Sequence, residues 1–269
     1  MVSFVATPIG NLGDITYRAV ETLKNADEIY CEDTRHTIRL LNAYEIRKPL
    51  YACHKFNERQ AAEKIAAAAL SGKNVAVVSD AGMPVVSDPG NVVCAVLKEK
   101  GVPYTVIPGA NAALCALILS GLPADKFLFV GFLPEKKGEK RAVLEKYKDT
   151  EATLLFHEAP QDIDGDVRAM YEAFGERRAA AGREITKIHE ECTAFRLSEG
   201  LPGEKRGEYV LVVAGAEKRE NPLCALTEKE HILHYMRAGY EKKEAVKMAA
   251  KDRGVTKSEL YPFSVDLSL

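Results

Sequence analysis

Apolar and polar positions alternate along the chain in a way that predicts strands and helices in turn. Short apolar runs predict strands over residues 3–7, 28–33 and 74–79, and the last of these is apolar almost throughout, as expected for a strand covered on both faces. Helical periodicity separates them and is clearest over residues 57–72, where Asn57 is expected to cap the helix. This alternation predicts a mostly parallel sheet with crossover helices.

A second series of the same kind begins near residue 125, after a short segment that contains glycine and proline. The segment 110–121 before it predicts a buried helix. From residue 224 onward the pattern changes to short helices that resemble a helix-turn-helix arrangement. The second series predicts strands near residues 126–136, 152–160, 178–186 and 207–215. These changes of pattern predict a division of the chain into residues 1–121, 122–223 and 224–269.

The composition is that of an ordinary globular protein. Hydrophobic residues make up 46% and charged residues 28% of the 269 residues. No apolar segment approaches the roughly 18 residues of a membrane span, and the N-terminal apolar run lacks the basic residues of a signal peptide. The six cysteines contain no C-x-x-C pair, which argues against a disulfide framework and a zinc site. We therefore expect a cytoplasmic protein with no metal site and no membrane contact.

Positive charge is concentrated in two segments, although the whole chain carries a net charge of −2. Residues 136–148 have a net charge of +4, and residues 241–257 have a net charge of +3. Both segments are expected to be helical, and most such segments are simply solvated helix faces. They are also the places where a nucleic acid would bind if the chain binds one.

Seven short polar loops follow predicted strands, and together they are the main functional signal. The most unusual is SDAGMPVVSDPG at residues 79–90, with two Asp, two Pro and two Gly. Loops at the carboxyl ends of parallel strands line the binding crevices of open α/β sheets. The chain lacks the dinucleotide fingerprint, a Walker motif and the G-x-S-x-G elbow. The loops lie at residues 7–14, 31–35, 79–90, 108–112, 131–134, 157–160 and 183–191.

The order and spacing of seven motifs resemble one known family. The motifs are TPIGNLGD, CEDTR, SDAGMPVVSDPG, PGANAAL, GFLP, REITKIHEE and GEYVLVV. They are similar to those of the small-subunit ribosomal RNA cytidine-2′-O-methyltransferases of the tetrapyrrole methylase superfamily, over nearly the whole chain. The resemblance implies two α/β domains with a small C-terminal helical unit, S-adenosylmethionine held between the domains, and a homodimer. It also implies methyl transfer to a ribose 2′-hydroxyl in the decoding region of 16S rRNA, with 16S rRNA or the small ribosomal subunit as partner.

The resemblance further implies which loops hold the cofactor. The loop 79–90 would wrap the methionine part, and the loops of the second domain would contact the adenosyl half. Gly82 would allow close backbone approach, and Asp80 or Asp88 would receive the ammonium group or a ribose hydroxyl. A plain helix start is the alternative for Asp88 and Gly90. The expected cofactor-binding residues are Pro8, Asp80, Gly82, Pro84, Val85, Ser87, Asp88, Ala110, Ala112, Leu133, Glu158 and Pro160.

The catalytic groups are expected in the segment REITK, residues 183–187. A ribose hydroxyl is a poor acid, so Lys187 is expected to orient it or to accept its proton, with Glu184 as partner and Arg183 on a phosphate. Strand alternation places Ile185 and Lys187 on one side if the strand continues. A structural ion-pair network is the alternative for these charges. The second candidate cluster is Glu32, Asp33 and Arg35.

Two segments depart from the family's pattern. Relatives carry Glu-Ser-Pro-His-Arg where this chain has Glu158, Ala159, Pro160, Gln161 and Asp162, so this turn lacks the basic pair for an RNA contact. The second departure is the segment 192–199, which includes Cys192 and Arg196. It lacks the Arg-Gly step that relatives carry there. Methylation of a small tetrapyrrole and ribosome binding without catalysis are the alternative functions. The two basic segments favour RNA over a tetrapyrrole.

Overall fold

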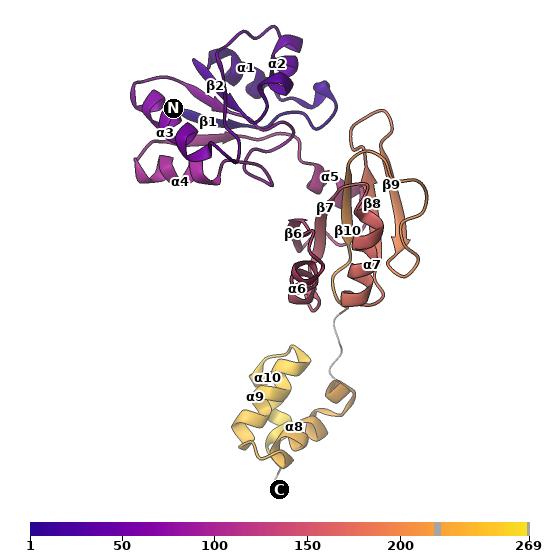
Figure 1. The fold of residues 1–269 in the computed structure, drawn as a ribbon. Coiled ribbons are helices and arrows are strands. Elements are labelled where there is room, and N and C mark those ends of the chain that lie inside the picture. Colours follow the sequence, from indigo (N-terminus) through magenta and orange to yellow (C-terminus); the bar gives the residue numbers. More distant parts are fainter. Residues whose placement is uncertain (218–221, 268–269) are drawn as a thin grey trace. The chain divides into compact units, whose positions relative to one another are not determined.

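The computed structural model describes residues 1–217 and 222–267, and the chain folds into two compact units. Residues 1–216 form the first unit, and residues 217–269 form the second. The first unit holds two five-stranded sheets with their helices, and the second unit is helical (Figure 1). Two α/β sheets and a helical C-terminal unit confirm the predicted fold class, whereas the domain boundaries at residues 121 and 223 stay predictions.

The first sheet is entirely parallel, with the strand order β3-β2-β4-β1-β5. Its strands are β1 (Val2–Val5), β2 (Glu28–Cys31), β3 (Leu50–Ala52), β4 (Val75–Val77) and β5 (Tyr104–Ile107). Its helices are α1 (Tyr17–Asn25), α2 (Thr34–Ala43), α3 (Glu58–Leu70) and α4 (Asn91–Glu99), with the 3-10 helix η1 (Leu12–Asp14). The apolar pattern does not predict β3, because two of its three residues are exposed at the sheet edge.

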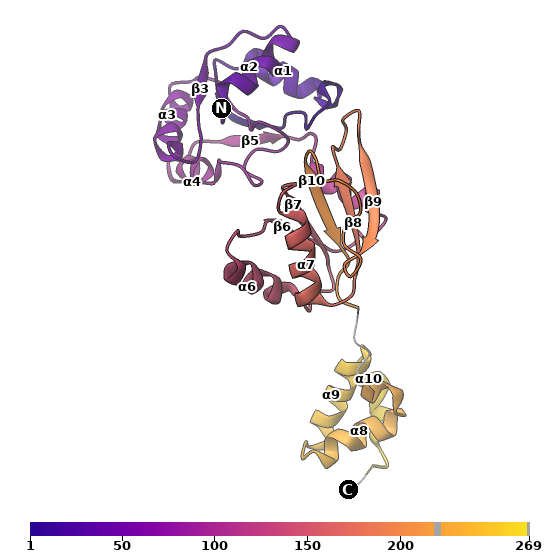
Figure 2. The same ribbon diagram turned by 45° about the vertical axis from the view of Figure 1, so that its right-hand side comes forward.

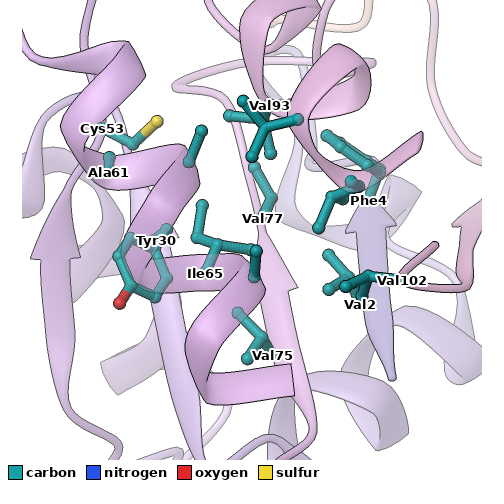
Figure 3. Close-up of a cluster of buried hydrophobic side chains, with 14 residues drawn as sticks. Val2, Phe4, Tyr30, Cys53, Ala61, Ile65, Val75, Val77, Val93 and Val102 are labelled. Carbon is teal, nitrogen blue, oxygen red and sulfur yellow. The ribbon is translucent and has the colours of Figure 1, made fainter. Parts of the chain in front are cut away.

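Helices cover both faces of the first sheet. On one face, Ile65 of α3 and Leu97 of α4 belong to the same buried cluster as Val77 of β4 (Figure 3). On the other face, Leu23 of α1 packs in a second cluster with Ile29 of β2. Because successive strand side chains point to opposite faces, a strand between two helical layers is apolar on both. This double burial explains the continuous apolar run over residues 74–79.

The second sheet is mixed, so the prediction of mostly parallel strands is wrong for this half of the chain. Its order is β6-β7-β10-β8-β9, in which only β6 and β7 are parallel. Antiparallel pairs arise because β9 folds back on β8 and β10 returns between β7 and β8. The strands are β6 (Phe127–Phe132), β7 (Thr153–Glu158), β8 (Arg178–Arg183), β9 (Glu191–Arg196) and β10 (Tyr209–Val213). The edge strand β9 is not predicted by the apolar pattern.

Helices also lie on both faces of the second sheet. Helices α6 (Lys137–Tyr147) and α7 (Ile163–Phe174) lie on one side of this sheet (Figure 2). They contribute Leu144 and Met170 to a buried cluster with Phe156 of β7. Helix α5 (Ala112–Ser120) packs through Leu117 on the opposite face. The prediction that this helix is buried is only half right, since Ile118 is 77% exposed. Its sequence is apolar all round, so it does not reveal which side faces the sheet.

The C-terminal unit is a small helical bundle, as predicted. Capping boxes start α8 at Thr227 and α10 at Thr256, and Ile232, Val246 and Leu260 lie in its apolar cluster. Its elements are η2 (Pro222–Ala225), α8 (Glu228–Arg237), α9 (Lys242–Arg253), α10 (Lys257–Leu260) and η3 (Tyr261–Ser264). Within the described residues, no helix has both the length and the apolar character to cross a membrane.

A buried histidine joins α8 to α9 in this unit. The Nε2 atom of His231 lies 3.1 Å from the Asp252 carboxylate, and Arg253 donates from Nε to His231 Nδ1 at 3.1 Å. A nitrogen that accepts from a guanidinium cannot also carry a proton. Burial lowers the pKa of His231 from its ordinary 6.5, although the nearby Asp252 opposes this shift. The contact between the two helices is therefore built around a neutral imidazole.

We expect the C-terminal unit to lose stability as the pH falls below 6.5, the ordinary pKa of histidine. The unfolded chain binds a proton there that the folded unit rejects, so stability is full above this pH and declines below it. Amide exchange of α8 and α9, compared at about pH 7.5 and about pH 5.5 after correction for intrinsic rates, measures the effect. His231→Gln should flatten the dependence, and His234→Gln on the same helix should keep it. Equal protection at both pH values would contradict this account.

Candidate functional site

The loop Ser79–Gly90 leaves β4 and is tied at its start to two neighbouring segments. Thr7 and Gly82 exchange two backbone hydrogen bonds, of 2.9 and 3.1 Å. The Asp80 carboxylate accepts a hydrogen bond of 3.0 Å from the backbone N–H of Asp33. Gly82 has φ of +75°, a conformation that favours glycine. The first half of the loop is thus fixed against the segments that follow β1 and β2.

The second half of the loop is strained and is held by a glutamate from α3. Val85 and Ser87 have φ of 77° and 68°, which costs on the order of 1–3 kcal/mol for each non-glycine residue. Glu58 accepts a hydrogen bond of 2.7 Å from the backbone N–H of Gly90, where α4 begins. The α4 start therefore has its acceptor in Glu58. This leaves the Asp88 carboxylate available for another role.

A cavity of about 580 Å³ lies beside this loop, within the first unit. One part of its wall comes from the loops that follow the first sheet, and the other part comes from the second sheet and α5. The first part contains the carboxylates of Glu32, Asp80 and Asp88. The second part is mainly aromatic and aliphatic, with Phe129 among its residues. The two parts differ sharply in polarity.

The acidic wall holds carboxylates with shifted proton affinity. Burial, together with the charges of Glu32 and Asp80, raises the pKa of Asp88 to about 6. Burial and the charge of Asp80 raise the pKa of Glu32 as well. Carboxyl groups that lie close together are harder to ionise, because their negative charges repel each other. A positively charged ligand reduces this repulsion and favours the ionised form. The acidic wall is suited to a cationic group.

The aromatic wall is built on β6 and β7. Phe127 and Phe129 line the cavity as alternate residues of β6, and Phe132 joins them because the pairing with β7 shifts register between Phe129 and Gly131. The His157 ring contacts Phe129 and Phe132 edge-on, with centroids 5.1 and 5.3 Å apart. Burial lowers the pKa of His157. A neutral ring among phenylalanines offers a surface for a flat heterocycle.

Glu158 closes the cavity where β7 ends, and its side chain is buried. The residue is 4% exposed, and Asp166, which forms an ion pair with Lys140, lies next to it. Burial and the charge of Asp166 raise the pKa of Glu158 to about 9. Its Oε1 atom is buried without a hydrogen-bond partner among the described residues. Burial therefore favours the neutral form of Glu158, whose Oε1 atom is left unsatisfied.

The structure brings together half of the expected cofactor-binding residues on the cavity wall. Their assignment to a cofactor stays a prediction. The residues that line the cavity are Asp80, Gly82, Ser87, Asp88, Ala112 and Glu158. Those that lie outside its lining are Pro8, Pro84, Val85, Ala110, Leu133 and Pro160. Some of these support the wall from behind: Val85 lies against Gly90, and the Ala110 carbonyl lies close to Gly82.

The segment REITK forms a turn, so the expected strand alternation fails there. Strand β8 ends at Arg183, and Glu184 and Thr186 follow with φ of 48° and 68°. The Thr186 hydroxyl donates a hydrogen bond to Asp14, in the segment that follows β1. As a result, Ile185 lines the cavity and Lys187 does not. Positive φ at two non-glycine residues marks this turn as one that its surroundings hold in place.

Lys187 is held between two carboxylates. Its Nζ atom lies 2.9 Å from Glu184 and 2.9 Å from Glu208, which lines the cavity. Partial burial opposes the charge, but the hydrogen bonds that Lys187 donates to Glu208 and Glu184 outweigh this effect and raise the pKa of Lys187. The lysine stem crosses Gly10, where a Cβ atom would lie 2.5 Å from Lys187 Cγ. Arg183 pairs with Glu191 at 3.5 Å. The charges thus form the ion-pair network given as the alternative, at the rim of the cavity.

The residues of the second candidate cluster, Glu32, Asp33 and Arg35, have different surroundings. Asp33 caps α2 by accepting from the Arg35 backbone at 2.8 Å, and it pairs with the Arg35 guanidinium at 2.6 Å. Hydrogen bonds from Arg35 lower the pKa of Asp33 to about 2. Only Glu32 of the three faces the cavity.

Comparison with known proteins identifies the family. The family model described as Tetrapyrrole (Corrin/Porphyrin) Methylases matches residues 1–200. The chain belongs to the tetrapyrrole methylase family. It is therefore a methyltransferase, and the resemblance drawn from its motifs is confirmed.

Individual methylases show how far the similarity extends. The chain is 45% identical to "Ribosomal RNA small subunit methyltransferase I" of Bacillus subtilis, over 96% of this chain and 91% of that protein. A protein of the same name from Thermotoga maritima is 41% identical, over 79% of this chain and 97% of that protein. The crystal structure of uroporphyrin-III C-methyl transferase from Thermus thermophilus, complexed with S-adenyl homocysteine, has a TM-score of 0.56. It is 19% identical and covers 78% of this chain and 96% of that chain.

Several residues of the cavity wall are not predicted by the sequence pattern of this methylase. Phe127 and Phe129 carry a signal, since they recur with period two in β6. Phe132 breaks that period and is brought in by the register shift. Glu208 lies 21 residues from Lys187, the lysine it holds. A contact over that separation has no local pattern to reveal it.

We expect Asp88 to titrate near pH 6 rather than near its ordinary 3.8. Glu32→Gln should lower this pKa, because it removes the like charge that contributes most to raising it. Carboxyl ¹³C shifts in an NMR titration report both values. Glu63→Gln on the exposed side of α3 is the matched control and should change nothing. An ordinary aspartate pKa in the unmodified protein would overturn this description of the acidic wall.

Proposed function

We propose that this methylase transfers the methyl group of S-adenosylmethionine to the ribose 2′-hydroxyl of a cytidine in the decoding region of 16S rRNA. The observation that carries the proposal is the 45% identity to the Bacillus subtilis protein, named a ribosomal RNA small subunit methyltransferase, over 96% of the chain. That span includes most of the C-terminal helical unit. A match of this extent points to a shared substrate class, whereas a shared fold alone would not.

The chemistry of the cavity supports S-adenosylmethionine as the cofactor. When bound, this cofactor supplies an activated methyl group on a positively charged sulfur. The Asp80 or Asp88 carboxylate would receive the ammonium group of its amino acid end or a ribose hydroxyl, and Phe129 and His157 would pack against its adenine. Each wall of the cavity thus matches one end of the cofactor.

The charged turn at the cavity rim supports an orienting role for Lys187. Because Glu184 and Glu208 raise its pKa, Lys187 stays protonated and would donate a hydrogen bond to the ribose oxygen instead of accepting its proton. Arg183 would bind an adjacent phosphate, since its guanidinium geometry suits that group. Both side chains would place the nucleophile without taking part in bond formation themselves.

The C-terminal unit supports RNA as the substrate. Lys243, Lys247 and Lys251 are exposed on α9 at intervals of four residues, so they form one basic stripe along the helix. A stripe of this kind matches the spacing of a phosphate backbone better than a small molecule. The Thermotoga maritima relative is about as long as the first unit, since 79% of this chain covers 97% of it. We therefore assign catalysis to the first unit and added RNA affinity to the second.

A homodimer in the cytoplasm completes the proposal. Leu114, Ile118 and Leu119 are exposed on one side of α5, and a row of exposed apolar residues on one helix is typical of an interface. The small ribosomal subunit is a cytoplasmic particle, so an enzyme acting on it would be found there.

The proposal is tested by offering different acceptors together with labelled S-adenosylmethionine. Small ribosomal subunits that lack the modification should gain label on a cytidine ribose, located by mass spectrometry of the digested 16S rRNA. Label on a uroporphyrin-type tetrapyrrole would favour the small-molecule function. Binding to the subunit without any transfer would favour a protein that has lost catalysis.

Lys187→Ala and Glu184→Gln should each lower turnover by about 10²-fold, the order of the loss when a reacting group is misplaced. Cofactor affinity should change little, since Lys187 lies outside the cavity lining. Tritium transfer at saturating substrate measures the first quantity, and calorimetry measures the second. Lys136→Ala is the matched control, because it removes an exposed ion pair of the same i,i+3 spacing. Near-normal turnover in both variants would remove REITK from catalysis.

Replacing Lys243, Lys247 and Lys251 together by alanine should weaken binding to the ribosomal subunit and leave cofactor affinity unchanged. The slope of log affinity against log salt should become shallower by about 2 to 3. With three fewer phosphate contacts, binding releases fewer counterions from the RNA. Removal of residues 217–269 should give the same result in stronger form. An unchanged slope in the triple variant would make the C-terminal unit a stability or dimer element.

A further inference from the structure

One aromatic side chain beside the site has no role in the cavity or in the core. Phe56 is 93% exposed and lies in the turn 53–57 after β3. The His54 ring contacts it edge-on, with centroids 6.1 Å apart. Lys55 precedes it and is exposed. An aromatic ring next to positive charge is the combination that binds single-stranded nucleic acid.

The turn that presents Phe56 is rigidly closed. Asn57 accepts a hydrogen bond of 2.8 Å from the backbone N–H of His54, and its side-chain amide donates to the Ala52 carbonyl at 3.0 Å. The Asn57 backbone N–H donates in turn to the His54 carbonyl at 3.0 Å. Asn57 therefore braces the turn with its side chain instead of capping α3 as expected. Because the backbone of the turn is already fixed, binding of a ligand to Phe56 would cost little further loop entropy.

The same turn is anchored to the functional site on two sides. Cys53 donates a backbone hydrogen bond of 2.7 Å to Cys31, so the turn starts beside Glu32, a residue of the cavity wall. His54 is close enough to Glu32 to interact with its carboxylate. Glu58, two residues after Phe56, holds the end of the loop Ser79–Gly90. Phe56 thus lies at the side of the cavity that the first sheet forms.

Positive charge continues from this turn along the sheet edge. Arg35 follows β2, the strand paired with β3, and its side chain is 88% exposed. Its bond to Asp33 uses the Nε and Nη2 atoms, which leaves part of the guanidinium directed to solvent. Lys55 and the free part of the Arg35 guanidinium would serve as the phosphate-binding groups that accompany a stacked base.

We propose that Phe56 is a stacking platform for a nucleobase of single-stranded RNA adjacent to the target nucleotide, with Lys55 and Arg35 on its phosphates. This inference rests on the proposed function, because it requires RNA at the cavity. It assigns to the turn 53–57 a positioning role. The stacked base would fix the strand so that the neighbouring ribose reaches the cavity.

The absence of tryptophan from the chain allows a direct test. Phe56→Trp introduces a single indole whose fluorescence a stacked base quenches. Oligocytidylate should quench it in a saturable, salt-dependent manner, and polyphosphate, which has no bases, should not. Tyr171→Trp is the matched control, since Tyr171 is 43% exposed on α7, no residue of which lines the cavity. The control should not be quenched.

Transfer kinetics on small ribosomal subunits give the second readout. Phe56→Ala should raise KM by about fivefold or more, the effect of losing one stacked base. Its affinity for S-adenosylhomocysteine should not change, and Phe56→Tyr should restore KM. Absence of quenching together with a normal KM in Phe56→Ala, while the unmodified protein methylates the subunit, would overturn this inference and leave the proposed function standing. An unmodified protein that transfers no methyl group to the subunit would overturn both.

Discussion

The site depends on holding the backbone of the loop Ser79–Gly90 in a conformation that it would not adopt alone. Val85 and Ser87 have positive φ without being glycine. The cost is met by contacts from elsewhere: Thr7 pairs with Gly82, and Glu58 binds the N–H of Gly90. Because these partners come from two different segments, the one after β1 and helix α3, the loop is held at both of its ends. Its polar groups are therefore placed before any ligand arrives.

That rigidity gives the cavity its contrast between two walls. The loops of the first sheet place Asp80 and Asp88 in one wall, where burial and the charges of Glu32 and Asp80 raise the pKa of Asp88. The second sheet supplies aromatic rings and a neutral acid, Glu158. The turn after β8 bonds to the segment after β1 through Thr186 and Asp14. The charged rim and the acidic wall are in this way parts of one bonded framework.

The parts of the structure that could be predicted are those with a local signal. The central strand β4 is apolar on both faces, and the unusual composition of residues 79–90 marks the loop that lines the cavity. The edge strands β3 and β9 could not be predicted, because the solvent side of an edge requires no apolar residues. The second sheet is mixed because β10 lies between β7 and β8. No short segment of the sequence predicts that position. The motif REITK predicts that Lys187 belongs to the site. Its partner Glu208 and its position outside the cavity lining could not be predicted, because they depend on the turn that follows the end of β8 at Arg183.

The central claim is that the cavity between these two walls binds the cofactor. A crystal structure of the protein with S-adenosylhomocysteine tests it most directly. The account predicts that the amino acid end of this ligand lies against Asp80 and Asp88, with its adenine against Phe129 and His157. Density for the ligand at another place on the protein, with this cavity empty, would contradict the account.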